Sequence, residues 1–253
     1  MADLNSVIDI HEARITKAIK ALDIRIRELT SNLGVERGRL VSDQISIARA
    51  IAMRQEILSE FSGFKNTIKE ATDVFTMASE DAVKALVAAG VSEAVVAADL
   101  DLVRAFQNDT YAELSMLGNQ YASKIGNLVY THVIAGGKRK DLISSVSQLL
   151  VGHKGKTGRP LLYLARTIVS TRTMEVYSTV LLRKAKALNI DKFRYDGSLI
   201  KDSRPWCVSH VNKVFTYAEI QTWADSKWAG KKEGDPFITR GGWNCRHQFV
   251  PVL

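Results

Sequence analysis

The sequence predicts a mainly α protein, with an elongated helical body over residues 1–188 and a small α+β module over residues 191–253. Apolar residues recur at helical spacing through the first part, and this periodicity is lost after Asn189. The last part, from Phe193 onward, holds both cysteines, all four tryptophans and three of the four prolines. Such an abrupt change in composition is typical of a small, irregular domain that follows a helical one.

The overall composition is that of a globular protein. The chain has 253 residues, of which 46% are hydrophobic and 25% charged, enough to bury a sizeable core. The net charge of +8 favours a negatively charged partner such as nucleic acid or an acidic protein surface, although an ordinary soluble protein can also be basic. No stretch approaches the ~20 apolar residues of a membrane span, and the N-terminus has no apolar signal core. Two cysteines are too few for a secreted disulfide scaffold, so we expect a cytoplasm-like compartment.

The first predicted helix begins near Ile8 and ends near Gly34. Its apolar residues are spaced four and three apart in alternation, which forms a heptad seam: Ile15, Ile19, Leu22, Ile26, Leu29 and Leu33. The seam can pack on the chain's own body, or it can mediate self-association or contact with another protein. Fewer than four clean heptads favour packing within the chain.

The other helices of the body follow from the same spacing. In order, they are expected over residues 42–61, 68–82, 82–106 with a break near Gly90, 108–134, 142–150 and 160–188. Gly63 is expected to end the helix over residues 42–61. Asp141 is expected to cap the short helix over residues 142–150. Pro160 suits the first turn of the long last helix, because its fixed φ is helical and it lacks an N–H.

Two basic loops lie between these last helices. Their cations are candidates for contact with nucleic acid or with an acidic partner: Lys138, Arg139, Lys140, Lys154, Lys156 and Arg159. Ordinary solvated loops explain the same residues equally well. The second loop includes the sequence GHKGKTG, which lacks the spacing of a nucleotide-binding P-loop and follows no predicted strand, so a nucleotide site is excluded.

The terminal module reads as short strands and turns. Strands are expected over residues 193–195, 213–215, 237–239 and 248–252. Thr216 and Glu219 have the spacing of a capping box, which predicts a short helix reaching Trp223.

Two Cys/His pairs, about forty residues apart, make a metal site the first hypothesis for the module. Cys207 and His210 form one pair, and Cys245 and His247 the other. Zinc takes four nitrogen or sulfur ligands, and small domains often need a metal ion or a disulfide to stabilise their fold. A contact between the two cysteines, reduced or oxidised, is one alternative, and unrelated buried residues are another.

A catalytic interpretation of the module is weaker. A Cys/His nucleophile pair needs a third group to orient the histidine, and the nearest acids are only Asp196, Asp202 and Asp235. Asp225, Glu233 and Asp235 show no spacing that selects them as a general acid–base pair. Nucleases of the HNH type also combine Cys, His and Asn, but Asn244-Cys-Arg-His247 lacks their paired histidines. We therefore expect no enzymatic activity and assign no catalytic residue.

The order of motifs from residue 160 to 253 resembles the phage minor head protein family, also called the Mu F-like or head morphogenesis family. A long helix leads into Phe193-Arg-Tyr195, followed by Asp202-Ser-Arg-Pro-Trp-Cys207, Lys213-Val-Phe215 and the closing Gly242-Trp-Asn-Cys-Arg-His247 with Pro251. The chain departs from the family's pattern at His247, where a second cysteine is common, and at Asn212, where glycine is common.

This resemblance implies a bacteriophage virion protein: a minor capsid component made in the host cytoplasm and located in the head near the portal vertex. It would act in head assembly or DNA delivery, with the portal protein, other head proteins and packaged DNA as partners. Two alternatives remain beside it. The first is an internal DNA-binding protein that is ejected with the genome, and the second is a metal-dependent nuclease.

Overall fold

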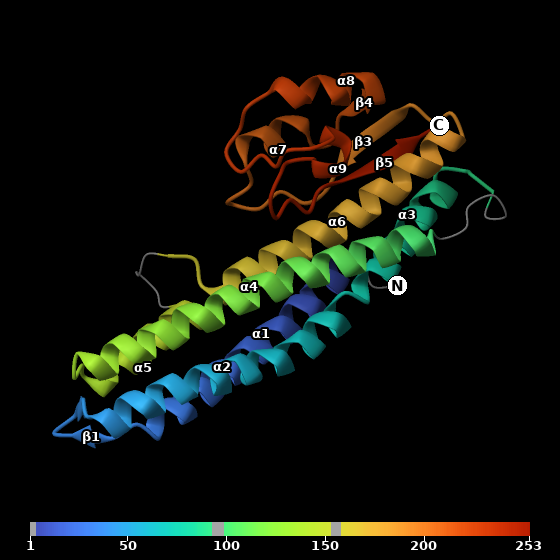
Figure 1. The fold of residues 1–253 in the computed structure, drawn as a ribbon. Coiled ribbons are helices and arrows are strands. Elements are labelled where there is room, and N and C mark those ends of the chain that lie inside the picture. The colour runs from blue at the N-terminus through green and yellow to red at the C-terminus, as the bar shows by residue number, and fades with distance from the viewer. Residues whose placement is uncertain (1–3, 93–98, 153–157) are drawn as a thin grey trace. The chain divides into compact units, whose positions relative to one another are not determined.

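The structure is a computed structural model that describes residues 4–92, 99–152 and 158–253 (Figure 1). It confirms a mainly α chain with a small C-terminal α+β region that carries a Cys/His cluster. The long helices are α1 (Leu4–Ser31), α2 (Gln44–Ala71), α3 (Val74–Ala88), α4 (Leu100–Ile134), α5 (Arg139–Leu150) and α6 (Leu161–Ala187). Among the helices in these ranges, none is both long enough and apolar enough to cross a membrane.

The chain divides into two compact units. Unit 1 consists of Met1–His11, Thr72–Thr110 and Thr167–Leu253, and unit 2 of Glu12–Ala71 and Tyr111–Arg166. The predicted terminal module therefore lies in unit 1, in the same unit as α3, most of α6 and the first turns of α1 and α4.

Unit 2 is helical and buries the seam of α1. Ile15, Ile19 and Ile26 have no exposed surface, and Leu22 and Leu33 are almost fully buried. Other buried apolar residues of this unit come from α2, α4, α5 and the start of α6, among them Ile57, Ile125, Val146 and Ala165. The seam is therefore covered by the chain itself, which is the packing favoured by its short length.

A β-hairpin in unit 2 corrects the expectation that strands are confined to the terminal module. Strand β1 (Val35–Glu36) pairs antiparallel with β2 (Arg39–Leu40). The two residues between them, Arg37 and Gly38, have φ of 50° and 77°, as the tight turns of two-residue hairpins require. Strands of two residues are too short to produce a recognisable alternation, and Arg-Gly is not a strong hairpin signal.

Several expected helix boundaries are also wrong. Helix α4 runs unbroken through the gap expected near residue 107, and the helix expected over residues 68–82 is divided between α2 and α3. Helix α2 continues through Gly63 to Ala71, because an isolated glycine in a helix costs only about 1 kcal/mol relative to alanine. Helix α5 begins at Arg139 with Lys138 as its N-cap. Asp141 thus lies in the first turn, where its charge still favours the positive end of the helix dipole, but it is not the cap.

The sheet of the terminal module confirms three of the four predicted strands. Strand β3 (Lys192–Asp196) is central, and it pairs antiparallel with β4 (Val214–Thr216) on one side and β5 (Gln248–Val252) on the other. Alternation along β3 buries Phe193 and Tyr195 completely. The capping box is present as expected: Thr216 accepts from the Glu219 N–H and opens α8 (Tyr217–Gln221), which continues as a 3-10 turn over Thr222–Asp225.

The fourth predicted strand, over residues 237–239, is instead the short helix α9 (Pro236–Thr239). Asp235 caps it by accepting a hydrogen bond from the Phe237 N–H at 2.8 Å, and Pro236 fits the first helical position. These two residues outweigh the strand preference of Phe237 and Ile238.

One core joins the module to the helices of unit 1. The rings of Phe193, Phe237 and Phe249 pack with centroids 4.4–6.3 Å apart. Leu4, Val7 and Ile8 belong to the same buried cluster, as do residues of α3 and α6. Arg246 forms an ion pair with Asp9 at 2.6 Å, so residues near both ends of the sequence meet in this unit.

Arg240, in the loop after α9, hydrogen-bonds residues of α6. Its side chain is completely buried and donates hydrogen bonds to the Met174 carbonyl at 2.8 Å and to Ser178 Oγ at 2.6 Å. Its Nε and Nη2 have no hydrogen-bond partner among the described residues, so these contacts fix the position of the loop while the buried charge is only partly satisfied.

Candidate metal centre

Cys207 is presented by the short helix α7 (Pro205–His210). Arg204 precedes the helix in an extended conformation, and Pro205 occupies its first turn, where no N–H is needed. One turn into the helix, the Cys207 side chain faces the interior and is 2% exposed.

Cys245 and His247 lie on the segment that leads into β5. This segment turns sharply, with φ of 96° at Gly242 and 57° at Asn244. It also passes very close to the sulfurs, because a Cβ at position 241 would lie 2.6 Å from Cys207 Sγ and 2.8 Å from Cys245 Sγ. Glycine at position 241 is therefore what allows the backbone to approach both thiols.

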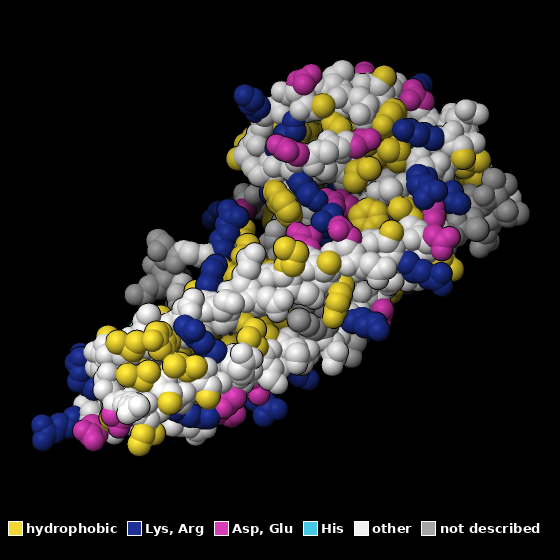
Figure 2. All heavy atoms as spheres, viewed as in Figure 1, with side chains coloured by type: hydrophobic (Ala, Val, Ile, Leu, Met, Phe, Trp, Pro, Cys, Tyr) yellow, Lys and Arg dark blue, Asp and Glu magenta, His cyan; other side chains and the backbone are white. Residues whose placement is uncertain are grey.

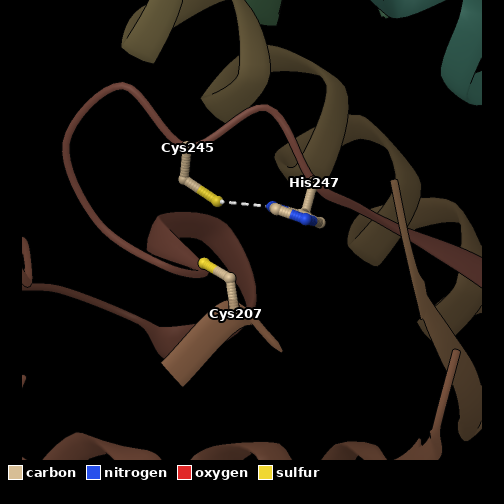
Figure 3. Close-up of side chains that lie close together, drawn as sticks. All are labelled: Cys207, Cys245 and His247. Atoms are coloured by element: carbon tan, nitrogen blue, oxygen red, sulfur yellow. Dashed lines mark hydrogen bonds between the residues drawn. The ribbon is translucent and has the colours of Figure 1, made fainter. Parts of the chain in front are cut away.

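The three side chains converge on one point, as Figure 3 shows. One ligand atom from each of Cys207, Cys245 and His247 lies within 4.8 Å of the other two, and all three residues are buried. The distance from Cys245 Sγ to His247 Nδ1 is 3.6 Å. A sulfur at about 2.3 Å and a nitrogen at about 2.0–2.1 Å from a tetrahedral zinc are separated by about 3.5–3.6 Å, so the pair has the spacing of two zinc ligands.

The packing of His247 also fits a ligand. Its ring stacks on Tyr195 with centroids 5.2 Å apart, which fixes the ring plane with Nδ1 near Cys245 Sγ. Among the described residues, its buried Nε2 has no hydrogen-bond partner, so the ring lacks the support that a ligating histidine usually receives on its other nitrogen. The ligand types, an imidazole next to two buried thiols, are those suited to zinc.

Tyr195 supplies the polar group that faces both sulfurs. Its hydroxyl lies 3.3 Å from Cys245 Sγ and 3.8 Å from Cys207 Sγ. Burial, and then the two neighbouring thiols, raise the pKa of the Tyr195 phenol well above its usual value. The phenol therefore stays protonated, and its O–H can donate a hydrogen bond to a sulfur.

The two thiols share protons unequally. Hydrogen bonding to Cys245, followed by burial, raises the pKa of the Cys207 thiol well above its usual value. The hydrogen bond from Cys207 is the main cause that lowers the pKa of Cys245 well below its usual value, while burial opposes it. The two shifts are opposite in direction because the thiols hydrogen-bond each other, and a metal that binds both sulfurs would displace their protons.

His210, the fourth predicted ligand, lies outside the group. Its Nδ1 is 2.6 Å from the Trp206 carbonyl, one turn earlier in its own helix, and its ring stacks on Trp206 at 4.2 Å. The Cys-x2-His spacing is therefore misleading here. The His210 imidazole packs on the Trp206 ring and does not point towards the same site as the Cys207 thiol.

Tyr195 could not be identified as part of this site from the sequence. It stands about a dozen residues before Cys207, and its only visible signal was the strand alternation that places its side chain inward. Gly241 and Gly242 are a visible signal in the sequence, since adjacent glycines permit a close backbone approach, and the structure shows that position 241 approaches the two sulfurs.

The predicted basic residues have no part in the metal centre and lie in unit 2. Lys138 and Lys140 are exposed, and Arg139 is half-buried. Arg159 is also exposed, its guanidinium lies over the Tyr163 ring, and its carbonyl accepts a hydrogen bond from Tyr121. Lys154 and Lys156 lie outside the described residues.

Replacing Tyr195 with phenylalanine is expected to weaken metal binding by about 10–100-fold, the usual effect of removing a group that hydrogen-bonds a ligand. The ring and its packing remain, so the fold should persist. Competition titration of zinc against a chromophoric chelator measures the change, with circular dichroism as the check on folding. An affinity equal to that of the wild type would mean that the hydroxyl does not support the thiolates.

Comparisons of the chain with protein-family models, with curated proteins and with solved structures found no match.

Proposed function

We propose that this chain is a non-enzymatic minor head protein of a bacteriophage, acting at the portal vertex in head assembly or DNA delivery. We further propose that a structural zinc ion closes its terminal module. The observation that carries the proposal is where the motifs of the family resemblance lie. The Asp202–Cys207 motif ends in the first half of α7, Lys213–Phe215 overlaps β4, and Gly242–His247 carries two members of the Cys/His cluster beside β5.

The burial of the cluster supports a structural role for the metal. Cys207, Cys245 and His247 are 2%, 3% and 7% exposed. A catalytic zinc keeps a position open to substrate, whereas a structural zinc is enclosed by protein. Cys207, Cys245 and His247 would hold the ion, and the bound ion would link α7 to the segment before β5.

The short elements of the module explain why such a link is useful. Its core is shared with the helices of unit 1, but α7 has only six residues and the segment over residues 240–247 has neither helix nor strand. A metal that joins segments about forty residues apart in sequence removes conformations from the unfolded chain and adds its binding free energy to folding. A rigid module suits a component that must keep its shape within a capsid.

The test is mass spectrometry of purified virions, with and without their DNA, combined with capture of this chain by the portal protein. We expect the protein in virions in a few copies and retained by portal. Incubation with duplex DNA and a divalent metal should produce no cleavage, with or without chelator. Absence from virions together with indifference to portal, or catalytic degradation of DNA, would contradict the proposal.

A further inference from the structure

Two basic segments about a hundred residues apart in sequence come together in unit 2. Arg39 of β2 forms an antiparallel bridge with Lys138. The Leu40 N–H donates to the Gly137 carbonyl at 2.9 Å, and the Arg139 N–H donates to the Gly38 carbonyl at 3.2 Å. The loop between α4 and α5 is thus joined to β2 by a single antiparallel bridge.

This pairing assembles a basic edge of five cations: Arg37, Arg39, Lys138, Arg139 and Lys140. All except the half-buried Arg139 are exposed. Figure 2 shows Lys and Arg side chains projecting at the tip of the hairpin. Within the described parts of the chain, no ion pair engages any of these five side chains.

The same segments carry fewer acids than cations. Three carboxylates are present: Glu36, Asp43 and Asp141. Asp43 accepts a hydrogen bond from the Ser46 N–H, and Asp141 stands in the first turn of α5. The edge therefore remains positive. Its cations come from the turn and second strand of the hairpin and from the start of α5, and the Arg39–Lys138 bridge holds these two segments together.

The chemistry of the edge fits a phosphate backbone better than a protein surface. Three of the five cations are arginines, whose planar guanidinium binds phosphate oxygens in pairs. Protein interfaces depend on buried aromatic or aliphatic anchors. Here the apolar residues of the hairpin do not supply one, because Leu40 is 3% exposed and Val35, directly opposite it, shares its face.

We propose that this basic edge binds the phosphate backbone of double-stranded DNA without reading base sequence. The side chains present are suited to phosphate contacts, which position a protein on a duplex and carry no sequence information themselves. The inference does not depend on the proposed head role, since the contact is a property of unit 2 and is measured with free DNA.

The test measures binding of the full chain to a short fluorescent duplex by anisotropy over a range of salt concentrations. The edge variant combines Arg37→Asn, Arg39→Gln and Lys140→Gln, with asparagine at position 37 because it tolerates positive φ. The control removes three exposed cations of unit 1, as Lys201→Gln, Lys213→Gln and Lys227→Gln. Each variant therefore loses the same charge, and circular dichroism establishes that both are folded.

The edge variant should bind about tenfold or more weakly. The slope of log K against log salt should fall by about 3, because each cation removed leaves one phosphate without a partner. The control should keep nearly the wild-type slope. Arg39→Lys alone, which keeps the charge, should retain most of the binding.

Equal losses in both variants would mean that only net charge matters and would overturn the proposal, as would wild-type binding by the edge variant. The same measurements are made with polyglutamate as an acidic polypeptide. Loss of polyglutamate binding with unchanged DNA binding would overturn the DNA assignment in favour of an acidic protein partner.

Discussion

Alanine in place of Gly242 is expected to destabilise unit 1 by roughly 3 kcal/mol or more. A Cβ at this position would lie 2.0 Å from the Gly230 carbonyl oxygen and 2.8 Å from Lys231 Cα. These are backbone atoms, which cannot move aside as the end of a flexible side chain can. The same Gly230 oxygen accepts a hydrogen bond from the Trp243 N–H at 2.9 Å, so relieving the clash would break a contact that shapes the loop before Cys245. The positive φ of 96° adds strain for any residue with a side chain.

Thermal denaturation measures this effect. A loss of 3 kcal/mol corresponds to a fall of about 6–12 °C in the melting temperature of a domain of this size. Gly63→Ala is the matched control, because Gly63 lies in α2 with nothing within 4 Å of the added Cβ. The control should be neutral or more stable by up to about 1 kcal/mol. Similar melting temperatures for the Gly242 variant and the wild type would show that the loop adapts without cost.

Cys245→Ser is expected to abolish zinc binding and to remove the metal dependence of stability. The wild type should bind one equivalent of zinc, and at free zinc a hundred times the dissociation constant the ion adds about 2.7 kcal/mol to unfolding. A chelator should therefore lower the melting temperature of the wild type, whereas the serine variant should melt at one temperature with or without chelator. Elemental analysis gives the zinc content directly.

His210→Asn is the control for that experiment. His210 lies near Cys207 in sequence but outside the cluster, and an asparagine amide can still donate to the Trp206 carbonyl. This variant should keep one equivalent of zinc. If it loses zinc as completely as Cys245→Ser, the ligand set is wrong; if the wild type binds no zinc at all, the metal proposal fails.

The long helices were predictable because their signal repeats over many residues. The alternating seam of α1 and the end of α6 before Asn189, which has a φ of 56°, both follow from periodicity and a helix stop. The strand over residues 248–252 was also predicted with its observed bounds. In each of these places local preference and tertiary packing favour the same conformation.

The elements that were missed depend on one or two residues. The β1–β2 hairpin rests on a two-residue turn and on pairing with a loop about a hundred residues away. Helix α9 rests on the cap from Asp235, which overrides a strand preference. The periodicity of apolar residues cannot predict such features, because each depends on only one or two positions.

The metal centre could be predicted only in part for a similar reason. Cysteines are informative in a sequence that has only two, so Cys207 and Cys245 were identified, together with the adjacent His247. Which histidine lies beside the two cysteines depends on the direction of its side chain. The His210 side chain stacks on the Trp206 ring and so points away from them. Tyr195 comes from β3, and only the folded sheet places its hydroxyl beside the sulfurs.

The composition of unit 1 has a consequence for how the chain folds as it is synthesised. Its core contains Ile8 and Phe249, which are separated by about 240 residues. At about 5–20 residues per second, a ribosome takes roughly 12–48 s to add those residues. Until then Leu4, Val7 and Ile8 have no final partners from β5, whereas every segment of unit 2 has been made once Arg166 is added. Unit 2 can therefore form first, and the apolar N-terminal residues complete their packing only after the strand containing Phe249 emerges.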